Sequence, residues 1–226
     1  MNLYFLVEGR RSEARIYPEW LAYLLPQLRR IRNFDDVEHN HYFLIDGGGY
    51  PSIYNHLKNA VAEVNSAPRY DYLILCLDAD ESTVEERIQQ IDDFMKREGL
   101  KPLHCHFKIV VQNRCLETWF LGNRMVYPRQ PNGEIFRQYC RFFDVSADDP
   151  ELMGVYKGFT SISLFHYSYL KAMLAERNIQ YTKSRPRAVV DPPYIDQLVS
   201  RVDNTDHLKS LKDFFDFCTS IKVGGG

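Results

Sequence analysis

The first half of the chain alternates between two hydrophobic patterns, one typical of buried strands and one typical of helices. Four short apolar runs predict strands, and each is followed by a segment whose apolar residues recur at helical spacing. The predicted strands are residues 2–9, 41–46, 71–78 and 106–113, and the predicted helices are residues 13–28, 52–64, 83–99 and 115–123. This order predicts an α/β fold with a mainly parallel, four-stranded sheet covered by helices on both faces.

The pattern changes beyond about residue 126, where the strand signals stop. Four later segments show helical spacing of their apolar residues: 133–143, 161–178, 193–202 and 206–221. We therefore expect a core over residues 1–125 and a mainly helical C-terminal extension over residues 126–226. No low-complexity linker separates the two parts, so we expect the extension to pack on the core as one unit.

The composition is that of a folded protein without a membrane span. Hydrophobic residues make up 45% of the chain, and no apolar run reaches the 18 residues that would cross a bilayer. The five cysteines are odd in number, form no C-x-x-C pair and lie in apolar surroundings. This pattern favours reduced core cysteines in a cytoplasmic protein.

The net charge of −2 gives no global attraction for nucleic acid, so a nucleic-acid ligand would need a local basic patch. One segment, residues 177–187, carries four cations and no acid. It is either such a patch or a solvated loop.

Carboxylates follow two of the predicted strands. Glu8 ends the first strand, and Asp78 and Asp80 end the third. Ligands of open parallel sheets lie outside the carboxyl ends of the strands, so the three carboxylates converge if these two strands are neighbours. Converging carboxylates repel, and a hard divalent cation such as Mg²⁺ or Mn²⁺ compensates for the repulsion. We expect Asp80 to continue the extended geometry and to point the same way as Asp78; alternatively, Asp80 caps the next helix.

The motifs "FLVEG", at Glu8, and "LCLDADES", at Asp78 and Asp80, resemble those of the TOPRIM domain. This catalytic module is similar in topoisomerases, primases and OLD-type nucleases. The chain looks like the small stand-alone bacterial TOPRIM proteins, RloB-like and OLD-related, many of which belong to phage-defence systems. The likeness covers roughly residues 1–125 and implies a Rossmann-like TOPRIM core.

The chain departs from some relatives in what it lacks. It contains no G-x-x-x-x-G-K-[ST] motif, so any ATPase partner would act in trans. It also shows no tyrosine-bearing topoisomerase domain. Topoisomerase and full primase activities are therefore not expected.

The resemblance implies two further acidic candidates. "EGRRSE" gives Glu13 in addition to Glu8, and "CLETWFLGN" gives Glu117. Glu13 is either a ligand of a second metal or a first-turn acid that interacts favourably with the helix dipole. Glu117 either completes the second metal site or lies on a helix surface.

The cationic candidates lie in loops. The resemblance to OLD nucleases implies a lysine that stabilises the charge of the transition state, and Lys157 in "GVYKGF" is the candidate, with Arg114 second. We also expect Arg114, Arg185 and Arg187 to bind the substrate. The loop "DGGGYPS" either offers backbone N–H groups to a phosphate or is a flexible turn.

These features together predict a Mg²⁺-dependent nuclease that hydrolyses phosphodiester bonds in DNA or RNA. Glu8, Asp78 and Asp80 would bind one metal or two metals about 4 Å apart, and Glu8 alternatively acts as the general base. Two other functions stay open. The protein is a nuclease toxin held inactive by a partner ATPase, or a catalytically inert module that binds a nucleotide or a partner. A homodimer is compatible with each.

Overall fold

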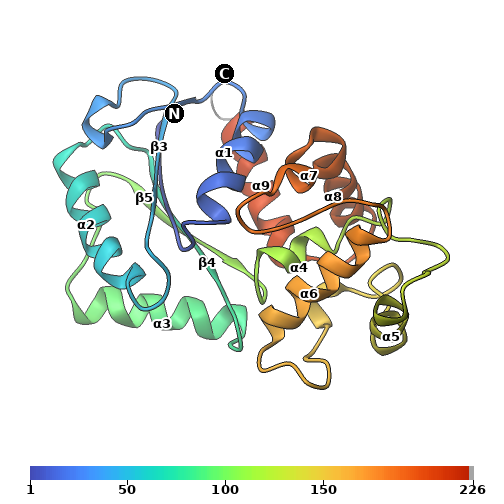
Figure 1. Ribbon diagram of the computed structural model, residues 1–226. Coiled ribbons are helices and arrows are strands. Elements are labelled where there is room, and N and C mark those ends of the chain that lie inside the picture. Colours follow the sequence, from blue (N-terminus) through green and yellow to red (C-terminus); the bar gives the residue numbers. More distant parts are fainter. Residues whose placement is uncertain (224–226) are drawn as a thin grey trace. The chain divides into compact units, whose positions relative to one another are not determined.

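A computed structural model describes residues 1–223, and within them the chain forms one five-stranded sheet flanked by helices (Figure 1). The strands are β1 (Leu3–Val7), β2 (Arg29–Arg30), β3 (His41–Asp46), β4 (Tyr72–Asp78) and β5 (His106–Gln112). Their order in the sheet is β2-β3-β1-β4-β5. The predicted α/β class with a mainly parallel sheet is confirmed. The predicted number of four strands is wrong, because β2 consists of two exposed arginines and has no apolar pattern.

Strand β1 is the central strand. It pairs in parallel with β3 on one side and with β4 on the other, and all five of its residues are buried. At the sheet's far edge, the His106 N–H donates to the Asp71 carbonyl at 2.9 Å and the Ala79 N–H donates to the Gln112 carbonyl at 3.0 Å. These bonds join the starts and the ends of β4 and β5, so β5 is parallel to β4 as well.

Every predicted helical segment contains a helix. The helices are α1 (Glu13–Leu24), α2 (Ile53–Ser66), α3 (Val84–Arg97), α4 (Leu116–Phe120), α5 (Glu134–Phe142), α6 (Ile162–Ala175), α7 (Arg187–Val190), α8 (Pro192–Asn204) and α9 (Lys209–Val223). Two 3₁₀ turns, η1 (Phe34–Asp36) and η2 (Pro150–Leu152), complete the set. Helix α7 was not expected, because four residues are too few for a periodic pattern.

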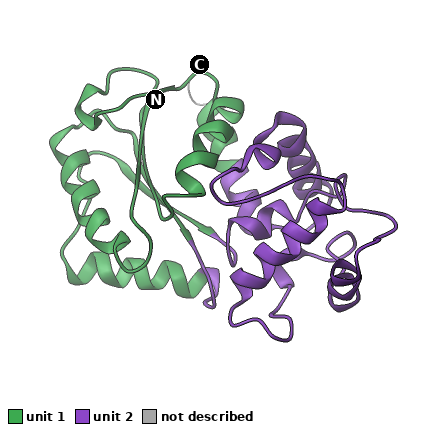
Figure 2. Ribbon diagram, viewed as in Figure 1, with its two compact units in different colours: residues 1–77, 85–111, 216–226 green, residues 78–84, 112–215 purple. Residues whose placement is uncertain are grey.

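The chain divides into two compact units (Figure 2). Of the described residues, 1–77, 85–111 and 216–223 form unit 1, and 78–84 and 112–215 form unit 2. Between residue 126 and the end of the described chain, the regular elements are helices. The division at residue 125 into a catalytic core and an extension packed on it stays a prediction.

In unit 1, helices cover both faces of the sheet, as predicted (Figure 1). The Tyr17 hydroxyl of α1 bonds the Cys76 thiol of β4, and Cys218 of α9 lies near the same thiol. Helices α1 and α9 therefore share one face, and α2 and α3 lie on the other. This arrangement follows from right-handed crossovers that run in opposite directions from β1 to β3 and from β3 to β4.

The cysteines are free thiols, as expected. Three of them, Cys76, Cys115 and Cys218, are buried. Burial raises the pKa of the Cys76 thiol to about 12, so this group stays protonated and unreactive at neutral pH. Among the helices of residues 1–223, none has the length and apolar character needed to cross a bilayer.

Candidate functional site

The carboxyl edge of the sheet carries two of the predicted acids. Val7 of β1 lies opposite Cys76 of β4, and the Glu8 N–H donates to the Cys76 carbonyl at 2.9 Å. Strand β4 then continues to Asp78. The prediction that these two strands are parallel neighbours is confirmed. The edge is also the point where the strand order reverses, because β3 lies on one side of β1 and β4 on the other, and open α/β sheets bind ligands at such points.

The glycine loop that follows β3 folds back onto the end of β1. The Gly47 N–H donates to the Val7 carbonyl at 2.8 Å, and the Gly49 N–H donates to the Glu8 carbonyl at 2.9 Å. Gly48 and Gly49 have φ values of 69° and 85°, which glycine adopts without strain. Two amides of this loop therefore fix the backbone around the half-buried Glu8, rather than facing a phosphate.

Glu13 is the first residue of α1 and is only 3% exposed. The Ser12 hydroxyl donates to its carboxylate. The carboxylate also packs so closely on Gly9 that a Cβ atom there would collide with it. The first-turn position of Glu13 is confirmed. The close packing of its carboxylate explains why a glycine follows Glu8. The second-metal role of Glu13 stays a prediction.

The segment Asp78–Ser82, here named the acidic loop, belongs to unit 2. Asp80 has a left-handed φ of 51°, so the expected extended geometry at Asp80 is wrong. The cause is that the Asp80 N–H donates to the carbonyl of Arg114 at 2.9 Å, and Arg114 is itself left-handed with φ of 68°. Aspartate is one of the few residues other than glycine that visits this conformation routinely.

Side chains of unit 2 hold the acidic loop in place. The Ser163 hydroxyl donates to Asp80 Oδ1 at 3.1 Å. Arg114 Nη1 donates to the carbonyls of Asp80 and Ser82, at 3.3 and 2.8 Å. Arg114 is half-buried and braces this loop; its substrate-binding role stays a prediction.

Glu117 lies in α4 and is only 1% exposed, so the alternative of a helix-surface carboxylate is wrong. The Tyr181 hydroxyl donates to Glu117 Oε1 at 2.9 Å, and Lys183 Nζ lies 3.6 Å from Oε2. Burial, reinforced by the Glu117 carboxylate, raises the pKa of Tyr181, so its hydroxyl remains a donor. Glu117 thus has two protein partners, and its metal role stays a prediction.

Three cationic candidates lie on the surface of unit 2. Lys157 is exposed in a turn beside Gly158, whose φ is 91°, so the predicted loop position is confirmed. Arg185 and Arg187 are also exposed. Their roles toward a substrate stay predictions.

Two cations of the basic segment 177–187 have partners in different parts of unit 2. Lys183 faces the carboxylate of Glu117, whereas Arg177 donates to the carbonyls of Val126 and Tyr127, at 3.2 and 3.0 Å. These contacts give Lys183 and Arg177 separate roles.

Sequence reasoning missed two exposed arginines, Arg124 and Arg129, in a groove of unit 2. The only sequence signal was a loop rich in arginine, proline and amides, "RMVYPRQPN".

Within residues 1–223, no three or more His, Cys, Asp and Glu side chains are arranged so as to hold a metal ion together. Mg²⁺ is commonly held by only one or two carboxylates, with waters and substrate phosphates as the other ligands. Glu8 in unit 1 and Asp78 and Asp80 in unit 2 each offer carboxylate oxygens of the kind that Mg²⁺ takes, and a site that they share stays a prediction.

Comparisons with protein-family models, with curated proteins and with solved structures found no match to this chain. The resemblance to TOPRIM proteins therefore stays a prediction that depends on the quoted motifs.

Proposed function

We propose that the protein is a Mg²⁺-dependent, TOPRIM-type nuclease that hydrolyses phosphodiester bonds in DNA or RNA. The observation that carries the proposal is the parallel pairing of β1 with β4. Glu8 follows one of these strands and Asp78 ends the other, at the edge where Rossmann-like sheets bind their ligands. A role in phage defence and a partner ATPase stay predictions.

Glu8, Asp78 and Asp80 are the residues that would hold the metal. When bound, Mg²⁺ supplies a Lewis acid for the phosphate and lowers the pKa of a bound water. The chain's own contribution is to fix the geometry. Ser163 orients the Asp80 carboxylate, and Arg114 holds the backbone of the acidic loop.

The remaining candidates have supporting roles in this proposal. Lys157 and Arg114 are the cations that would offset the charge of the pentacovalent phosphate. Arg185 and Arg187 are exposed and would contact substrate phosphates.

A cleavage assay tests the proposal. The purified protein is incubated with single- and double-stranded DNA and RNA, with Mg²⁺ or Mn²⁺. We expect Asp78→Asn to lower the cleavage rate at least about 1,000-fold, because the substitution removes a charged metal ligand. The matched control is Asp203→Asn, which changes an exposed carboxylate of α8 and should leave the rate unchanged.

Two results would contradict the proposal. One is undiminished cleavage by both Asp78→Asn and Glu8→Gln. The other is no cleavage of any substrate by the folded wild-type protein with either metal, alone or with a co-purified partner. In that case, nucleotide binding without turnover, measured by calorimetry, would favour the binding-module alternative.

A further inference from the structure

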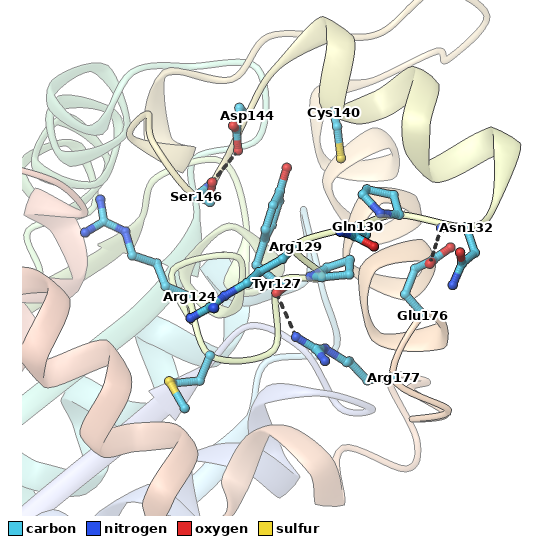
Figure 3. A pocket seen from close by; sticks show the side chains of 13 residues that line it. Arg124, Tyr127, Arg129, Gln130, Asn132, Cys140, Asp144, Ser146, Glu176 and Arg177 are labelled. Carbon is cyan, nitrogen blue, oxygen red and sulfur yellow. Dashed lines mark hydrogen bonds between the residues drawn. The ribbon is translucent and has the colours of Figure 1, made fainter.

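A large groove in unit 2 lies outside all the residues assigned above to catalysis. Residues 124–132, here named the arginine loop, form one side of it, and α5 and the end of α6 contribute to the other (Figure 3). Its volume is about 1170 Å³. Small-molecule sites usually measure about 300–1,000 Å³, so this open groove has room for an extended ligand.

The two carboxylates that line the groove, those of Asp144 and Glu176, accept hydrogen bonds from the protein itself. Asp144 accepts hydrogen bonds from the N–H and the hydroxyl of Ser146, at 2.9 and 2.7 Å. The Tyr127 hydroxyl also bonds Asp144, and Figure 3 shows the Tyr127 side chain pointing from the loop towards it. Their negative charge is therefore directed at protein donors.

Glu176 is the second of these carboxylates. It accepts from the N–H groups of Asn132 and Gly133, at 2.8 and 2.7 Å. Gly133 is the N-cap of α5, so Glu176 satisfies donors at the start of that helix.

The cations of the groove are placed differently. Arg124 and Arg129 are exposed, and within residues 1–223 neither guanidinium makes a hydrogen bond or an ion pair. Arg177 braces the loop through hydrogen bonds to the carbonyls of Val126 and Tyr127. Guanidinium groups match the geometry of phosphate oxygens, so this arrangement selects an anionic ligand with phosphates.

Two exposed amides extend the chemistry of the groove. Gln130 and Asn132 lie in the same loop as the two arginines. Their side chains offer donors and acceptors that the edges of unpaired bases can use. Phosphate and base contacts side by side are typical of sites for a single nucleic-acid strand.

We propose that this groove binds the phosphodiester backbone of a single nucleic-acid strand through Arg124 and Arg129, with Arg177 positioning the loop. The inference rests on the proposed function, because the groove would bind a segment of the nucleic-acid substrate away from the bond that is cleaved. Arg124 and Arg129 are binding residues and take no part in the chemistry.

The test measures binding apart from cleavage. Fluorescence anisotropy follows short labelled single strands of DNA and RNA in EDTA, across a range of salt concentrations. We expect the double variant Arg124→Gln/Arg129→Gln to bind at least about 10-fold more weakly at low salt. The slope of log K against log salt should fall by about 1.4, because each phosphate contact on a single strand contributes about 0.7. Arg32→Gln, at an exposed arginine of unit 1, is the control and should change neither quantity.

Four outcomes would overturn the inference: unchanged affinity and slope in the double variant, no binding by the wild-type protein, equal binding of a matched duplex, or equal binding of a mononucleotide. Asp78→Asn separates this inference from the proposed function. Binding by Asp78→Asn with cleavage lost supports both, whereas cleavage by a double variant that binds normally rejects the groove alone. Circular dichroism checks that each variant is folded.

Discussion

The acidic loop and the arginine loop, both in unit 2, hold their charges in opposite ways. In the acidic loop, the charged group itself is fixed, because the Asp80 carboxylate accepts from Ser163 and the backbone is braced by Arg114. In the arginine loop, the backbone is braced but Arg124 and Arg129 extend into solvent.

The difference teaches that hydrogen-bond partners indicate what a charged loop does better than charge alone. Carboxylates that bind a metal must be held close together against their mutual repulsion, which requires a rigid support. Arginines that bind a nucleic-acid strand benefit from long, flexible side chains, because they contact phosphates whose positions vary. Four predictions test this contrast, from the largest expected effect to the smallest.

The support of the acidic loop should weaken in acid. His166 lies in α6, three residues after Ser163, and its ring bonds the Thr118 hydroxyl and the Met153 carbonyl, each at 2.8 Å. Burial lowers the pKa of His166 to about 4, from about 6.5 in an unfolded chain. The unfolded chain therefore binds the proton first as the pH falls. This group's contribution to stability is complete above pH 6.5 and is lost towards pH 4, by about 3 kcal/mol.

Urea unfolding at pH 7 and pH 4 measures this loss. Between pH 7 and pH 4, the free energy of unfolding of His166→Gln should fall by about 3 kcal/mol less than that of the wild-type protein. An equal drop in both proteins would show that His166 does not couple folding to pH.

Arg114→Ala should lower the free energy of unfolding by about 2 kcal/mol. The substitution leaves the carbonyls of Asp80 and Ser82 without their charge-assisted donor. Arg114→Gly relieves the left-handed strain and should recover part of the loss. Urea unfolding of both variants checks this; stability equal to wild type in Arg114→Ala would remove the bracing role.

Asp80→Ala should cost about 1 kcal/mol of stability, because alanine tolerates a φ of 51° poorly and cannot accept from Ser163. Asp80→Asn should be nearly neutral for stability, since asparagine adopts this conformation and keeps an acceptor. Cleavage should nevertheless fall in both variants. Thermal unfolding measures the contribution of Asp80 to stability, and cleavage rates measure the contribution of its negative charge to catalysis. Full activity of Asp80→Asn would show that the charge is not needed for cleavage.

Arg177→Ala should cost only about 0.5 kcal/mol, although it removes two hydrogen bonds to carbonyls, because this side chain is exposed and water replaces the donors. Strand binding should weaken a few-fold, as the arginine loop loses its brace. If Arg177→Ala lost as much stability as Arg114→Ala, the claim that the acidic loop is braced more strongly than the arginine loop would be wrong.

Hydrophobic periodicity predicted the long elements, because their buried faces require it. It missed β2, where two exposed arginines pair with His41 and Tyr42, since edge pairing needs no apolar side chain. Periodicity could not decide whether Glu117 is buried, because every residue of α4 is buried and such a helix has no polar face.

Only those features of the site that depend on residues close together in the sequence, or on the order of the elements, could be predicted. The order of strands and helices allowed β1 and β4 to be neighbours, with Glu8 beside the end of β4, and the structure shows that they are. The backbone conformation of Asp80 did not, because it depends on Arg114, which is distant in the sequence. Arg124 and Arg129 gave no periodic signal, because they lie in a loop. Their groove is completed by α5 and by residues that directly follow α6, which are distant in the sequence.

Helix α9 contributes residues to unit 1 although it follows every strand in the chain. The Phe217 ring lies 5.2 Å from that of Tyr72, and the Lys108 ammonium lies 5.9 Å from the Phe217 ring centre. During translation, the sheet therefore emerges from the ribosome before the segment that covers part of one of its faces. The part of that face that α9 covers stays exposed to water until α9 has been synthesised, and exposed apolar surface of this kind makes folding intermediates prone to aggregate.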